Sequence, residues 1–144
     1  GDVYKRQVED RGVTGTIQYC DRHRAIQLEW TENERTGKVA VAVTTGVTGT
    51  SVTVRHTVAD DQRWGEYGPA ELGVVWDEAL AALDVHLSGN IGHTREVLEQ
   101  IRAEQGQDAL RGRLVEAWRQ EHVTAGAEQD EARQRSEAAA RLLG

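Results

Sequence analysis

The side chains that could do chemistry in this sequence are one histidine and two tryptophans, all on segments with regular apolar patterns. His56 lies in an alternating run, on the same side as Val52 and Val54. An imidazole beside an apolar surface can orient a polar ligand or transfer a proton. Trp30 and Trp76 can line an apolar cavity, since each carries a large apolar ring. The alternative for all three residues is an ordinary packing role in the core.

The remaining titratable residues indicate no metal site, no cofactor and no catalytic residue. Cys20 is the one cysteine, which excludes an internal disulfide. The sequence contains no phosphate-binding loop and no nucleophile elbow. The other histidines lack the spacing of metal ligands, and we expect an acidic stretch near one helix start to face water. These histidines are His23, His86, His93 and His122, and the acidic residues are Asp60, Asp61, Glu66, Glu71, Asp77 and Glu78.

Composition narrows the class of protein. The chain has 144 residues and a net charge of −7, with 24 acidic against 17 basic residues, which argues against nucleic-acid binding. Its apolar runs are too short for a membrane-spanning helix, and no signal-peptide core is visible, so we expect a cytoplasmic protein. Methionine is absent, and residues 1–7 look like a translated adapter sequence. We therefore expect the natural protein to start near Val8, as a fragment of a longer chain.

Residues 12–58 predict an antiparallel sheet. Four runs alternate between apolar and polar residues and are rich in β-branched side chains, which is typical of half-buried strands. The short links between them favour an antiparallel meander, and its apolar face must be covered. The runs are residues 12–19, 24–31, 38–44 and 51–58.

The rest of the chain predicts helices after a loop at residues 60–69. Apolar residues at three- and four-residue spacing indicate a long amphipathic helix over residues 71–88. Three more helices are expected, of which the last has few apolar anchors. The face of Leu110, Leu114 and Trp118 is expected to pack within the chain, on the convex side of its own sheet, with packing on a second copy as the alternative. The three helices are residues 93–105, 108–123 and 128–143.

This order of elements resembles the C-terminal half of the SRPBCC superfamily, the helix-grip fold of START and Bet v 1-like proteins. Residues 49–56 are similar to the family's GTxLTLTH strand, and residues 75–87 to its GWxxALxxLxxHL helix, with Val75 in place of the glycine. The branch most similar is the bacterial group related to the activator of Hsp90 ATPase. The resemblance implies an α+β fold in which residues 8–89 are the C-terminal part of the domain and residues 90–144 a helical extension.

The resemblance also implies a function. We expect a non-catalytic domain that binds a small apolar molecule between the sheet and the long helix. The alternatives are a co-chaperone-like protein-interaction module and an enzyme similar to polyketide cyclases and dehydratases. A protein partner, or a homodimer through the helical extension, is a further expectation. The residues expected to face the ligand are Trp30, Val41, Val54, His56, Trp76 and Leu80.

Overall fold

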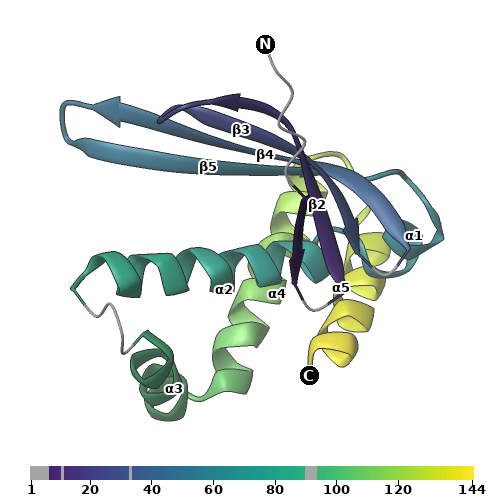
Figure 1. Cartoon of the computed structure of the whole chain (residues 1–144). Coiled ribbons are helices and arrows are strands. Elements are labelled where there is room, and N and C mark those ends of the chain that lie inside the picture. The colour runs from purple at the N-terminus through teal and green to yellow at the C-terminus, as the bar shows by residue number, and fades with distance from the viewer. Residues whose placement is uncertain (1–6, 11, 33, 90–93) are drawn as a thin grey trace. The chain divides into compact units, whose positions relative to one another are not determined.

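The chain is α+β, with all its strands before its helices (Figure 1). The computed structural model describes residues 7–10, 12–32, 34–89 and 94–144. Contacts divide the chain into a sheet unit, residues 1–59, and a helical unit, residues 60–144, and each is described by itself. The division after residue 89, which follows from the family resemblance, stays a prediction. Among the described helices, none combines the length and the apolar composition that crossing a bilayer requires.

The sheet unit contains one antiparallel sheet with its strands in sequence order, as a meander. The four predicted strands are confirmed, with links shorter than expected. A further short strand precedes them, which the sequence did not predict because four residues are too few to show an alternating pattern. The strands are β1 (Gln7–Asp10), β2 (Val13–Asp21), β3 (Ala25–Glu32), β4 (Arg35–Gly46) and β5 (Gly49–Thr57).

Strand register determines which side chains share a face. Residues directly opposite each other in an antiparallel pair point to the same side, and neighbours along a strand point to opposite sides. The apolar residues of β3, β4 and β5 therefore line one face, where Leu28 and Val39 are buried. The rows across this face are Ile26–Val41–Val54, Leu28–Val39–His56 and Trp30–Gly37.

Trp30 lies between two glycines, Gly15 on β2 and Gly37 on β4. A Cβ at Gly15 would lie 3.6 Å from Cε3 of the Trp30 ring, so the indole covers this glycine. A Cβ at Gly37 would lie only 2.4 Å from the carbonyl oxygen of Thr57. Because neither neighbour carries a side chain, the indole has room on both sides.

The helical unit holds one helix that the sequence analysis did not predict. The segment 60–69, expected as a loop, contains a six-residue helix. Asp61 caps the start of this helix, because its carboxylate accepts a hydrogen bond from the backbone N–H of Trp64 at 2.9 Å. Gly68, at φ 61°, ends this helix. The three later helices are confirmed, although His93 lies outside the described residues. The helices are α1 (Gln62–Tyr67), α2 (Ala70–Leu87), α3 (Thr94–Gln105), α4 (Gln107–Thr124) and α5 (Gln129–Leu143).

The core of the helical unit lies where α2, α4 and α5 meet. Leu114 and Trp118 of α4 pack against it, so this face packs within the chain, but on other helices and not on the sheet that the sequence analysis expected as its partner. A homodimer through these helices stays a prediction. Gly73 lets α2 approach α4 closely, because a Cβ there would lie 2.2 Å from the Trp118 ring. The buried residues of this core are Ala70, Val74, Val115 and Ala139.

The C-terminal helix α5 is anchored by small residues rather than by large apolar ones. Ala132, Ser136 and Ala139 are buried and follow each other at four- and three-residue spacing, so they share one face. Small side chains let the backbone of a helix come close to its neighbours, and α5 contacts α1, α2 and α4. Although α5 has few large apolar residues, it therefore still has a packed face.

The close approach at Gly73 gives the first testable prediction. In Gly73→Ala the new methyl group displaces the Trp118 ring, and overpacking of this kind costs about 1 to 3 kcal/mol. Gly112→Ala in α4 is the matched control, since a Cβ there meets nothing within 4 Å and gains up to about 1 kcal/mol from helix propensity. Denaturant unfolding followed by circular dichroism measures both. Equal stabilisation by the two substitutions would contradict the close approach.

Candidate functional site

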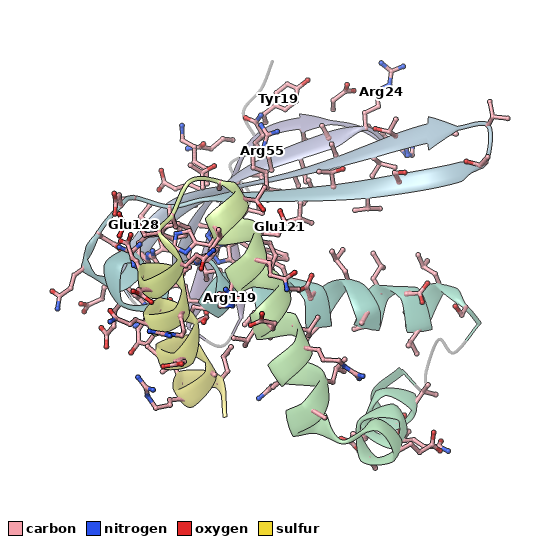
Figure 2. All side chains as sticks on the ribbon, turned by 180° about the vertical axis from the view of Figure 1, so that it is seen from behind. Tyr19, Arg24, Arg55, Arg119, Glu121 and Glu128 are labelled. Atoms are coloured by element: carbon pink, nitrogen blue, oxygen red, sulfur yellow. The ribbon has the colours of Figure 1, made fainter. Side chains whose placement is uncertain are left out.

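Four of the six predicted site residues share the apolar face of the sheet. They are Trp30 on β3, Val41 on β4, and Val54 and His56 on β5, and each is half-buried. The opposite face is polar: Figure 2 shows Tyr19 and Arg55 on it, in one cross-strand row. The alternation in the sequence therefore assigned these four residues to the correct face.

The two rings of this face touch although they belong to strands that are not neighbours. The ring centroids of Trp30 and His56 lie 6.4 Å apart, with an edge-to-face angle of 69°. Strand β4 runs between them, and neighbouring strands are about 4.8 Å apart. Gly37 lies opposite Trp30 on β4, and a Cβ there would meet the backbone of Thr57 and the side chain of Val58. Trp30 and His56 form an aromatic pair at one end of the apolar face.

Two charged residues lie at the same end of this face. Glu32 ends β3 and lies opposite Arg35, which begins β4. The indole N–H of Trp30 donates to Oε2 of Glu32 at 3.5 Å, a long hydrogen bond. Both residues are half-buried and close enough to act on the charge of His56. We call Trp30, Glu32, Arg35 and His56 the polar end of the face.

Electrostatics at the polar end favour a neutral imidazole. Burial lowers the pKa of His56 and outweighs the carboxylate of Glu32, which raises it, while the positive charge of Arg35 lowers it further. A neutral imidazole carries one hydrogen-bond donor and one acceptor. A neutral His56 therefore places polar ring nitrogens beside an apolar surface.

Sequence reasoning missed Glu32 and Arg35, because it placed both in a connecting segment rather than in strands. In the structure β3 ends at Glu32 and β4 begins at Arg35. Glu32 and Arg35 therefore continue the alternation of Trp30 and Gly37 along their strands. Extending the period-two pattern across the link would have placed both on the face of His56. The available signal was the continued alternation of the strands.

The other two predicted site residues, Trp76 and Leu80, lie on α2 in the helical unit. Trp76 is half-buried, and Leu80 keeps 36% of its surface exposed. They share a helix face with Leu83 and Leu87, whose exposed fractions are 38% and 71%. Helix α2 packs against α4 and α5 through other residues, Ala70 and Val74. The face of Trp76, Leu80, Leu83 and Leu87 is therefore a second apolar face of α2, outside the described core.

The acidic residues near the start of α2 do not all face water, and that expectation is wrong for three of them. Glu71 is 7% exposed, and Asp77 and Glu78 are half-buried. Each has a donor from another helix, which offsets the cost of removing a carboxylate from water. The contacts are Arg63 with Glu71, the indole N–H of Trp118 with Asp77 at 2.7 Å, and Nε of Arg111 with Glu78 at 2.8 Å.

A second ring pair lies in the helical unit, between Trp64 of α1 and His122 of α4. Their centroids are 5.8 Å apart. Burial lowers the pKa of His122, and Arg135 lowers it further, whereas Glu131 raises it. Glu131 and Arg135 form an ion pair one turn apart on α5, so their charges largely cancel. This cluster is a packed junction of three helices.

Within the part of the chain that the structure describes, no group of three or more His, Cys, Asp or Glu side chains could hold a metal ion. Cys20 is exposed and has a free thiol. Comparisons with protein-family models, curated proteins and solved structures found no match for this chain. The function of this chain is therefore inferred from its own side chains.

The lowered pKa of His56 predicts a loss of stability in acid. Below about pH 6.5 the imidazole of His56 binds a proton more readily in the unfolded chain than in the folded chain. The free energy of unfolding therefore falls as the pH falls through that value. His56→Gln should lose less stability than the original chain between about pH 7.5 and about pH 5.5 in denaturant unfolding. His23→Asn, at an exposed turn histidine, is the control. Parallel pH profiles for the original chain and His56→Gln would contradict the assignment.

Proposed function

We propose that this chain is an SRPBCC-type, non-catalytic domain that binds a small apolar molecule against the apolar face of its sheet. The observation that carries the proposal is the contact of Trp30 with His56 at one end of this face. It offers an apolar surface and a hydrogen-bonding group side by side. The ligand we expect has an apolar body and one hydroxyl or carbonyl group.

The exposed part of the face supports this proposal. Val43 and Val52 lie opposite each other near the β4–β5 turn, and they keep 37% and 39% of their surfaces exposed. Covering apolar surface contributes roughly 25 cal/mol per Å² removed from water. A ligand that extends from the polar end toward these valines would gain affinity along its whole length.

The second apolar face of α2 is our candidate for the other wall of the site, as in a helix-grip arrangement. Trp76, Leu80, Leu83 and Leu87 form a continuous stripe on it. The exposure of the last three supports this role, because apolar side chains in a row are normally covered by something. A ligand that contacts both faces would bury more apolar surface than the sheet alone can offer.

A protein-interaction module is the second candidate function. Its support is the exposure of Val75 and Leu87 on α2, at 50% and 71%, since exposed apolar residues of this size are common at protein interfaces. A partner protein would cover Val75, which lies outside the stripe of Trp76, Leu80, Leu83 and Leu87, whereas a small ligand would contact the sheet face and that stripe. Variants on these different surfaces therefore distinguish ligand binding from protein binding.

Titration with the apolar fluorophore Nile red tests the proposal on the sheet. In Val41→Trp the new ring fills the space beside Val54 and Ile26, so we expect at least about tenfold weaker binding, which is about 1.4 kcal/mol. Ala42→Trp adds the same ring to the opposite face and should bind as the original chain does. Circular dichroism checks that both variants fold. Equal affinity for the two variants would contradict the proposal.

A second pair of variants tests α2 as the other wall. Leu80→Lys places a charge on the apolar stripe and should weaken Nile red binding about tenfold. Ala81→Lys places the same charge on the next residue, which is exposed and outside the stripe, and should leave the affinity unchanged. If Leu80→Lys binds normally while Val41→Trp does not, the sheet is the site and α2 is not its wall.

A further inference from the structure

The polar end of the apolar face carries one negative and one positive charge. Of the strand side chains that the structure describes on this face, Glu32 and Arg35 are the two that are ionised at neutral pH. They lie directly opposite each other, where β3 ends and β4 begins, and both are half-buried. Opposite charges that face each other across two strands attract. Each charge at the polar end therefore has a counter-charge within the chain.

Both charges are placed to act on a ligand that reaches the aromatic pair. Oε2 of Glu32 accepts the indole N–H of Trp30 at 3.5 Å, which keeps the carboxylate beside the two rings. Burial lowers the pKa of His56, the charge of Glu32 raises it, and the charge of Arg35 lowers it, so both charges reach the imidazole. A ligand group beside His56 therefore lies within range of both.

This balance decides which head groups the polar end can take. A charged group that leaves water is costly unless it gains a partner of opposite charge. A ligand carboxylate would meet the negative charge of Glu32, while the positive charge of Arg35 already faces Glu32 across the strands. An alkylammonium group would be in the same position with the signs reversed. A hydroxyl group adds no charge and can use the ring nitrogens of His56.

We infer that the polar end selects apolar ligands with an uncharged head group, and that Glu32 excludes carboxylates while Arg35 excludes alkylammonium groups. This inference rests on the proposed function and deepens it, because it assigns ligand specificity to two residues. Fatty alcohols and similar neutral amphiphiles are then the ligand class, and fatty acids and fatty amines are not.

Straight-chain amphiphiles that share one tail isolate the contribution of the head group. Along β5, His56 and Val52 are four residues apart, which is about 13 Å, and Val52 keeps 39% of its surface exposed. A decyl chain has a similar length. Decanol, decanoate and decylammonium therefore offer the same tail with a neutral, a negative and a positive head group.

Displacement of Nile red by these three compounds tests the inference on the full chain. At about pH 7.5 the acid is ionised and the amine is protonated, and concentrations are kept below micelle formation. We expect decanol to bind at least about tenfold more tightly than either charged compound. The affinity of each variant for Nile red is measured first, so that displacement gives a dissociation constant.

Removing the negative charge should admit the fatty acid. Glu32→Gln keeps an oxygen for the indole N–H of Trp30, and it leaves the charge of Arg35 available for a charge-assisted hydrogen bond with decanoate. The preference for decanol over decanoate should fall about tenfold. Glu29→Gln removes the same charge from an exposed residue on the opposite face and should keep the preference. Because both variants change the net charge equally, the comparison separates the polar end from the overall charge.

Removing the positive charge should have the opposite effect. In Arg35→Gln the carboxylate of Glu32 becomes available to decylammonium, so the preference for decanol over decylammonium should fall about tenfold. Arg55→Gln is the matched control, because Arg55 is exposed on the polar face (Figure 2). Circular dichroism checks that all four variants fold.

Two outcomes would overturn this inference alone. The first is equal affinity of the original chain for decanol, decanoate and decylammonium. The second is an equal change of preference in Glu32→Gln and Glu29→Gln, which would assign the selection to the overall charge. If Nile red and all three compounds fail to bind the original chain, the proposed function fails together with the inference.

Discussion

The alternation of side chains along β3, β4 and β5 is the constraint on which the account depends. Because opposite residues share a face, the register of three strands gathers Trp30, Val41, Val54 and His56 on one side of the sheet. A one-residue slip would turn every one of them to the polar face. Within this face Trp30 contacts His56 across β4, while Gly37 allows a close approach of β4 to the carbonyl oxygen of Thr57. The polar end of the face is thus a product of strand register.

The helical unit uses a different packing principle, which is close approach through small residues. Gly73 receives the ring of Trp118, and alanine and serine side chains anchor α5. The indole N–H of Trp118 then donates to Asp77, which fixes the ring at both its apolar and its polar edge. This packing uses one face of α2 and keeps the stripe of Trp76 and Leu80 out of the helical core. Both units therefore carry an apolar surface beyond what their own cores require.

Much of this fold follows from the sequence, because strands with β-branched residues in strict alternation and helices of twelve or more residues have strong periodic signals. Helix α1 was missed because six residues show no helical period, and its cap at Asp61 was the one local signal. The burial of Glu71 was missed because its partner Arg63 comes from that same unpredicted helix. At the candidate site, the face of each strand residue was predictable. Glu32 and Arg35 were not, since their role depends on where β3 and β4 end.

Methyl-labelled valines observed by NMR while Nile red is added give the most direct test of binding on the sheet face. We expect the methyl signals of Val39, Val41 and Val54 to shift together with added ligand and to report one dissociation constant. Val74 and Val115, in the core of the helical unit, should keep their signals unchanged. Saturating shifts at Val74 and Val115 with none at Val41 and Val54 would contradict the account.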